Sequence, residues 1–175
     1  MTIRPLTEIP EFAKCVELQR EAWEAPDIDL VPARMYVVQS RIGGLILGAF
    51  DRDRLVGYLT TMPGIQKDGM PYWHSQMMAV AADHRNSGIG VQLKLAQRDH
   101  AQRRGIKLIQ WTYDPLESKN AYLNITKLGV IVREYCVNLY GIPAARLHQG
   151  LDTDRAIAEW WVDEPRVKQI GRAHV

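Results

Sequence analysis

A short glycine-containing segment is the part of this sequence whose residue types most directly suggest chemistry. It reads Arg85-Asn86-Ser87-Gly88-Ile89-Gly90-Val91 and stands between an apolar stretch and a segment of helical periodicity. Glycines at the start of a helix leave backbone N–H groups exposed, and the helix dipole favours an anion at that end. We therefore predict a phosphate-binding loop. A helix whose glycines only permit close packing is the alternative.

Two better-known phosphate motifs do not fit this segment. A Walker loop needs Gly-Lys-Ser/Thr, whereas Gly90 is followed by Val91-Gln92. A dinucleotide fingerprint needs a third glycine, and that position holds Leu93. The loop is therefore expected to hold phosphate in some other way.

The surrounding chain predicts strands and helices that would position this loop. Apolar and β-branched runs favour strands over 3–6, 45–50, 55–62, 72–80, 108–113, 130–136 and 156–162. Helical spacing favours helices over 8–24, 33–40, 88–104 and 114–128. Gly105 is expected to end the third helix in a left-handed conformation, and Asp114 to cap the start of the fourth. We expect one α/β domain with a mixed sheet over residues 1–165, followed by a tail over 166–175.

Composition excludes several other classes of protein. The apolar fraction is 46%, yet no apolar run is long enough to cross a bilayer, so we expect no membrane partner. A net charge of +2 argues against a nucleic-acid partner. The two cysteines, Cys15 and Cys136, exclude a disulfide framework and favour the cytoplasm. No spacing of His and Cys suggests a metal site.

The last six residues, Ile170–Val175, lack an apolar period. They also match what a widely used sequencing adapter encodes in one reading frame. We therefore hypothesise that residues 170–175 are not native and that the natural chain continues. A native polar tail is the alternative.

The glycine loop resembles a known family motif. Arg85-x-x-Gly88-x-Gly90, after a strand ending Met78-Ala79-Val80, is similar to the acyl-CoA-binding motif of the GCN5-related N-acetyltransferase (GNAT) superfamily. The order of predicted elements is similar to that fold over nearly the whole chain. The resemblance implies a mixed, mostly antiparallel sheet with splayed fourth and fifth strands, flanked by helices. Further segments resemble a poorly characterised bacterial branch: Trp111–Leu116, Asn120-Ala121, Asn124 and Leu128-Gly129.

The resemblance also implies how acetyl-CoA, or another short-chain acyl-CoA, would be held. The pantetheine arm would pair with the backbone of Met78 and Val80, and the Met78 amide would polarise the thioester carbonyl. Asn120 and Asn124 are spaced to share a helix face, where they would bond to the ligand or face solvent. The pyrophosphate would lie beside Arg85 on the backbone amides of Asn86, Ser87, Gly88, Ile89, Gly90 and Val91.

Catalytic roles are implied less completely. Many family members place a glutamate eleven residues before the first position of the glycine motif, and here that residue is His74. With an ordinary pKa of about 6.5, His74 could act as a general base or could simply form a hydrogen bond. The usual acid is a tyrosine four residues before the helix's final glycine, but Ile125 stands there. Tyr122 and Asn120 are the candidates nearby. Tyr113 and Tyr140 could also approach as the acid, and packing is the alternative role for each of these tyrosines.

The expected function is therefore transfer of an acetyl or other short acyl group from acyl-CoA to a primary amine. We expect direct transfer in a ternary complex, because neither cysteine is a convincing nucleophile. The acceptor is expected to be a small molecule, with a protein amine second, bound near Asp27, Asp29, Tyr140 and Arg146. A homodimer is left open. A non-catalytic acyl-CoA-binding or regulatory domain is the alternative, and Ile125 favours it.

Overall fold

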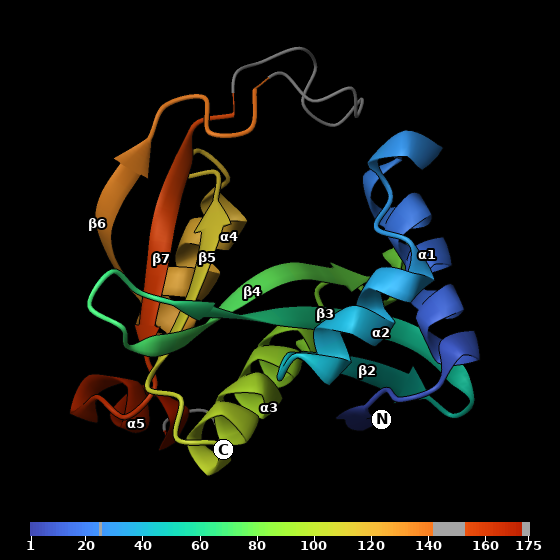
Figure 1. Cartoon of the computed structure of the whole chain (residues 1–175), viewed down its shortest axis with the longest axis horizontal. Helices are drawn as coiled ribbons and strands as arrows, with labels where there is room; N and C mark the ends of the chain where they lie inside the picture. Colours follow the sequence, from blue (N-terminus) through green and yellow to red (C-terminus); the bar gives the residue numbers. More distant parts are fainter. Residues whose placement is uncertain (25, 142–152, 173–175) are drawn as a thin grey trace.

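A seven-stranded sheet flanked by helices makes up the computed structural model, which describes residues 1–24, 26–141 and 153–172 (Figure 1). The described strands are β1 (Thr2–Pro5), β2 (Leu45–Asp51), β3 (Arg54–Ile65), β4 (Pro71–Val80), β5 (Leu108–Tyr113), β6 (Ile131–Cys136) and β7 (Arg155–Trp161). The described helices are α1 (Ile9–Trp23), α2 (Ala33–Arg41), α3 (Ile89–Arg103), α4 (Ser118–Tyr122), which continues as a π-helical segment (Leu123–Lys127), and α5 (Pro165–Arg172). Single 3₁₀ turns lie at Asp27–Asp29 and Ala82–His84.

The strand order is β1-β2-β3-β4-β5-β7-β6, and every neighbouring pair is antiparallel except β4 and β5. This confirms the predicted mixed, mostly antiparallel sheet. The first hairpin turns at Arg52-Asp53, where Arg52 has a φ of 53°, as the polar run after β2 predicts. Helices α1 and α2 cover one face of the sheet, and α3 covers the other.

The two faces bury different kinds of side chain. On the α1–α2 face, the rings of Phe12, Tyr36 and Tyr58 form a chain with centroids 6.1 and 6.3 Å apart. On the α3 face, Ile89 and Leu93 approach the backbone of Gly57 so closely that a Cβ there would lie 3.0 Å from Ile89. Burial of these apolar side chains fixes both helix layers on the sheet.

The predicted splay of β4 and β5 is confirmed. Their only paired residues are Trp73 with Ile109 and His74 with Gln110. Past that point β4 continues along β3 as far as Val80, while β5 continues along β7. A bulge between Thr60 and Thr61 of β3 marks the place where the register of β4 shifts. The two strands therefore share a closed end and then separate.

Helix ends agree with the sequence in one place and differ in another. Gly105 takes a φ of +70° after α3, as predicted. The prediction that Asp114 caps the next helix is wrong, because α4 begins at Ser118 after Glu117. Asp114 Oδ1 instead accepts a hydrogen bond of 2.9 Å from the Leu116 amide, in a turn that precedes the helix. Short polar side chains form such turns as readily as caps.

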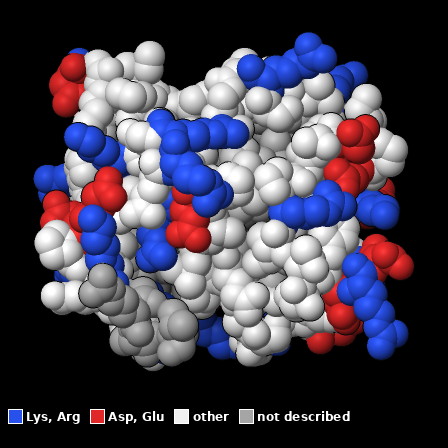
Figure 2. All heavy atoms as spheres, turned by 90° about the horizontal axis from the view of Figure 1, so that it is seen from below, with Lys and Arg blue, Asp and Glu red and all other residues white. Residues whose placement is uncertain are grey.

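Helix α5 begins at Pro165, the last residue of the predicted domain, and its Val167 is buried. The adapter origin of residues 170–175 stays a prediction. No helix among the described residues is both long and apolar enough to cross a membrane. Figure 2 shows one face of the molecule, on which basic and acidic side chains lie beside one another in several places.

A close backbone approach at Gly44, between α2 and β2, predicts a large loss of stability on substitution. A Cβ there would lie 2.3 Å from the Thr61 carbonyl oxygen and 2.6 Å from that of Gln39. We expect Gly44→Ala to lower the free energy of unfolding by about 1–3 kcal/mol, since neither backbone atom can move cheaply. Gly90→Ala is the matched control, because its nearest neighbour would be Met78 Cε at 3.5 Å. Urea unfolding measures both, and equal stability of Gly44→Ala and the wild type would contradict the packing described.

Candidate active site

The inner edge of β4 carries backbone groups that β5 does not pair. The Ala81 amide bonds to the Val56 carbonyl of β3 at 2.8 Å, so alternate residues of this part of β4 also point to β3. The N–H and C=O groups of Met78 and Val80 therefore point the other way, into the splay. Both residues lie beyond the last pair with β5. This edge can accept an extended ligand as an additional strand.

The glycine loop presents a row of free amides at the start of α3. Asn86 and Gly88 have φ values of +62° and +84°, and the Ser87 hydroxyl donates to the His84 carbonyl at 2.5 Å. No side chain caps α3, and its first intrahelical bond runs from Gln92 to Gly88. Across the described part of the chain, the amides from residue 86 to residue 91 donate to no protein acceptor. Such a concave run of N–H groups favours an anion.

The charges around this loop also favour an anion. Asp83 is paired with Arg54 at 2.5 Å and with His84 at 2.9 Å. The bonds from Arg54 and His84 hold the pKa of Asp83 well below its usual range, and the bond from Asp83 raises the pKa of His84. Arg85 is exposed, and its Nε contacts the Val80 carbonyl at 3.4 Å. The carboxylate of Asp83 is thus neutralised by Arg54 and His84, and Arg85 stays exposed as a cation that an anion could approach.

Side chains near the closed end of the splay divide between the two faces of the sheet. Ser75 and Trp111 both contact Lys94 of α3, so they face that helix. The neighbouring residues His74, Gln110 and Thr112 therefore face the α1–α2 side, because side chains alternate along a strand. Gln76, also on that side, accepts a 2.6 Å bond from Gln39 of α2.

His74 is half-buried at this closed end, paired across the strands with Gln110. Burial lowers its pKa, and the positive charge of Lys94 acts in the same direction. Burial also lowers the pKa of Lys94 itself well below its usual range, so the charge of Lys94 is a weak cause and desolvation of His74 is the main one. The imidazole is accordingly neutral at pH 7 and able to accept a proton.

The predicted residues on α4 have unequal environments. Tyr122, Ile125 and Asn120 are exposed, whereas Asn124 is buried at 3% exposure. The helix changes to π geometry at Leu123, so the four-residue spacing of the two asparagines does not give them one common environment. Among the cofactor residues, Asn86, Ser87 and Gly88 are exposed, Met78, Val80, Gly90 and Val91 are half-buried and Ile89 is buried.

Tyr140 approaches the face of β5 that His74 also faces. Its hydroxyl lies 2.9 Å from Thr112 Oγ1, and the guanidinium of Arg155 lies 5.9 Å from its ring centre. Sequence reasoning named Tyr140 but missed Thr112, which has no motif around it. Tyr113 is half-buried, and burial raises its pKa.

The loop residues named for the acceptor site are only partly described. Asp27 accepts two bonds from Arg20, at 3.1 and 3.0 Å, and Asp29 is exposed beside it. Arg146 lies in the range 142–152, outside the described residues. The described part of the expected acceptor region is thus the acidic loop after α1 together with Tyr140.

The chemistry of the cysteines is unfavourable for a covalent intermediate. Cys15 is buried, and burial raises the pKa of its thiol to about 12. Burial and Glu134 also raise the pKa of Cys136. Thiols with raised pKa values are poor nucleophiles at neutral pH.

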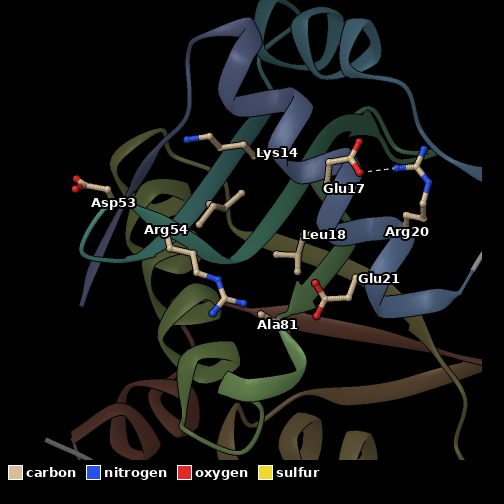
Figure 3. A pocket seen from close by; sticks show the side chains of 9 residues that line it. Lys14, Glu17, Leu18, Arg20, Glu21, Asp53, Arg54 and Ala81 are labelled. Atoms are coloured by element: carbon tan, nitrogen blue, oxygen red, sulfur yellow. Dashed lines mark hydrogen bonds and ion pairs between the residues drawn. The ribbon is translucent and has the colours of Figure 1, made fainter.

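A hollow of about 550 Å³ lies between α1 and the β2–β3 hairpin and reaches Ala81, just after the end of β4 (Figure 3). Three of its charged side chains form ion pairs: Arg20 with Glu17 at 2.7 Å, and Arg54 with Asp83. Glu21 accepts a bond of 3.3 Å from the Ala82 amide. Ion pairs and a side-chain hydrogen bond therefore line this hollow. The backbone groups that could bind an extended ligand lie instead on β4 and in the glycine loop.

Comparison with known proteins gives a family and a fold. The model of the acetyltransferase (GNAT) family matches residues 12–124. A protein from Salmonella typhimurium, yncA, solved with its cofactor acetyl-CoA, superposes with a TM-score of 0.74 at 17% identity, covering 93% of this chain and 94% of that one. The ribosomal-protein-S18-alanine N-acetyltransferase of Escherichia coli gives 0.72 at 15% identity, covering 93% and 94%. Aminoglycoside 6'-acetyltransferase type Ii gives 0.72 at 20% identity, covering 94% and 99%. A search of curated protein sequences found no match.

These three structures share the fold described above, and the family match spans most of the chain from α1 to α4. The match includes β4, the glycine loop and α3, where the unpaired backbone groups lie. The chain therefore belongs to the GNAT family of acyl-CoA-dependent acetyltransferases.

Proposed function

We propose that this acetyltransferase moves an acetyl or other short acyl group from acyl-CoA to a primary amine of a small molecule. The observation that carries the proposal is a strip of backbone groups with few protein partners. It comprises the groups of Met78 and Val80 that β5 does not pair, of which the Val80 carbonyl accepts a 3.4 Å bond from Arg85 Nε, and the free amides of residues 86–91. An extended arm that ends in a pyrophosphate matches such a strip in both shape and charge.

The residues present fit a coenzyme A group. The amides of Asn86 to Val91 would bind its phosphate oxygens, with Arg85 as a cation beside them. Met78 and Val80 would bond to the amide groups of the pantetheine arm. When bound, the thioester supplies an activated acyl carbon. Asn124, buried on the segment after α4, would bond to the same ligand, as would Asn120.

Transfer needs a base to accept a proton from the amine and an acid to protonate the leaving thiolate. The chain offers one candidate for the base and more than one for the acid. His74 is neutral near pH 7 and would accept a proton from the attacking amine. The Met78 amide would donate to the developing oxyanion. For the acid, Tyr122 remains our candidate, with Asn120 in support, because Ile125 cannot donate a proton. Tyr140, bound to Thr112 on the face shared with His74, is a second candidate acid.

Direct transfer follows from the same arrangement. Since Cys15 and Cys136 have raised pKa values, we propose that amine and acyl-CoA bind together and react without an enzyme-bound acyl group. The exposed carboxylate of Asp29 would attract a cationic amine. The names of two similar structures include a protein acceptor and an aminoglycoside, so both acceptor classes belong in the test. A cytoplasmic location and a homodimer remain predictions.

A matched glycine pair tests the phosphate loop. Gly88 and Gly69 have φ values of +84° and +85°, and neither would bring a Cβ within 4 Å of other atoms. Alanine at either position is therefore strained to the same degree, by about 1–2 kcal/mol. We expect only Gly88→Ala to weaken binding of coenzyme A, by about tenfold or more, because it moves amides that bond to a charged group. Isothermal titration calorimetry measures this, and equal weakening by both variants would refute the assignment of the loop.

Activity itself is tested by release of free thiol from acetyl-CoA over a panel of small amines and N-terminal peptides. We expect His74→Gln to lower kcat by about 10²–10⁴-fold while leaving coenzyme A affinity unchanged. The wild-type kcat/KM should fall on the acid side, with a midpoint below 6.5, because protonation removes the base. That acid limb should disappear in His74→Gln. Binding of acetyl-CoA without turnover of any amine would instead favour the non-catalytic alternative.

A further inference from the structure

Lys94 of α3 is buried inside the protein at 3% exposure, in a position that the proposed mechanism does not use. Its Nζ donates to Ser75 Oγ at 2.8 Å and lies 3.4 Å from Gln97 Oε1. It also sits 3.5 Å above the centre of the Trp111 ring. Gln97 is held in turn by a 2.6 Å bond to Thr61 Oγ1 of β3. Two oxygens and a ring face thus surround the amine nitrogen.

The partners of Lys94 lie at a particular place in the sheet. β4 and β5 pair last at His74 and Gln110, so Ser75 and Trp111 are the first residues past the closed end. On the α3 face, the Lys94 head contacts one residue from each strand just where the strands separate. The Lys94 side chain therefore fills the inner end of the splay.

A buried lysine is costly, so its contacts indicate what it does. Its hydrogen-bond and ring partners among the described residues are neutral, with no carboxylate to compensate a charge. Burial lowers its pKa well below the usual range, which favours the neutral amine. A neutral amine whose two N–H groups are taken by Ser75 Oγ and Gln97 Oε1 does not attract a ligand anion. It is a fixed polar plug rather than a binding group.

We propose that Lys94, together with Ser75 and Trp111, closes the inner end of the acyl slot and restricts the donor to short acyl groups. This inference rests on the proposed function, in which the arm runs from the loop along Val80 and Met78. The acyl group then continues toward Ser75. Because of the bulge, Met78 and Ser75 pair with Leu59 and Thr61, which are two residues apart on β3, so Ser75 lies about 7 Å beyond Met78 at about 3.3 Å per residue. Contact distances of about 3.5–4 Å at the Lys94 end leave room for only a few carbons.

A longer chain would have to displace the amine from all three partners. That movement would leave Ser75, Gln97 and the amine unpaired in a buried region, which is unfavourable. An alkyl chain offers them no replacement hydrogen bond. The polar plug therefore discriminates against length more sharply than a flexible apolar side chain would.

Two variants of Lys94 separate the length of the side chain from its polarity. Lys94→Leu shortens the reach of the side chain by two atoms and leaves an apolar residue suited to a core, so space opens at the closed end. Lys94→Met keeps nearly the full length without the amine. The readout is the ratio of kcat/KM for butyryl-CoA to that for acetyl-CoA. We expect Lys94→Leu to raise this ratio by about tenfold or more, and Lys94→Met to raise it much less.

Lys67→Leu, in the exposed turn between β3 and β4, is the matched control and should leave the ratio unchanged. Thermal unfolding and coenzyme A affinity confirm that each variant is folded and binds, since coenzyme A itself carries no acyl group.

An unchanged ratio in a folded, binding Lys94→Leu overturns this inference while the proposed function stands. A wild type that binds no coenzyme A overturns the proposed function. A wild-type preference for succinyl-CoA overturns the plug, because Lys94 would then bind the terminal carboxylate. Should Lys94→Leu fail to fold, Ser75→Val, which fills the same end, is expected to lower the ratio, and a raised ratio there contradicts the proposal.

Discussion

The short parallel ladder between β4 and β5 is the constraint on which the rest of the structure depends. Two pairs of residues join the strands, and then β4 follows β3 while β5 follows β7. Backbone groups left unpaired inside a sheet are unfavourable unless a ligand or water completes them. The splay therefore leaves backbone N–H and C=O groups of Met78 and Val80 without a partner in β5. The helix that follows β4 begins without a side-chain cap, so the amides of the glycine loop are also free to bond to a ligand.

The ion pairs around the loop keep this capacity available for an anion. Asp83 could oppose a phosphate, but Arg54 and His84 hold it, and Arg85 remains exposed. At the other end of the splay, the pleat of β4 sends His74 to one face and Ser75 to the other. The closed end thus has a neutral imidazole on the α1–α2 side and a buried amine on the α3 side.

Much of the fold was predictable because its signals are local. Glycines, polar turns and runs of β-branched residues gave strands within a few residues of those observed, and Gly105 ended α3 as expected. The order of those elements, with the spacing of Arg85, Gly88 and Gly90, was enough for the family. Asp114 was assigned wrongly because an Asp before a proline suits a cap and a turn equally well. The contacts of Lys94 and Thr112 could not be foreseen, since they join helices and strands far apart in the chain. The π-helical segment after Tyr122 was also not foreseen, because no local pattern distinguishes it from an ordinary helical turn.

Backbone amide signals measured by NMR with and without coenzyme A test the central claim most directly. If β4 and the loop form one binding strip, the amides of Met78 and Val80 and those of residues 86–91 should shift together and exchange more slowly when coenzyme A is added. The amides of Gln66 to Met70, in the turn between β3 and β4, should not respond. Changes confined to the hollow between α1 and the β2–β3 hairpin, with β4 and the loop unaffected, would contradict the account.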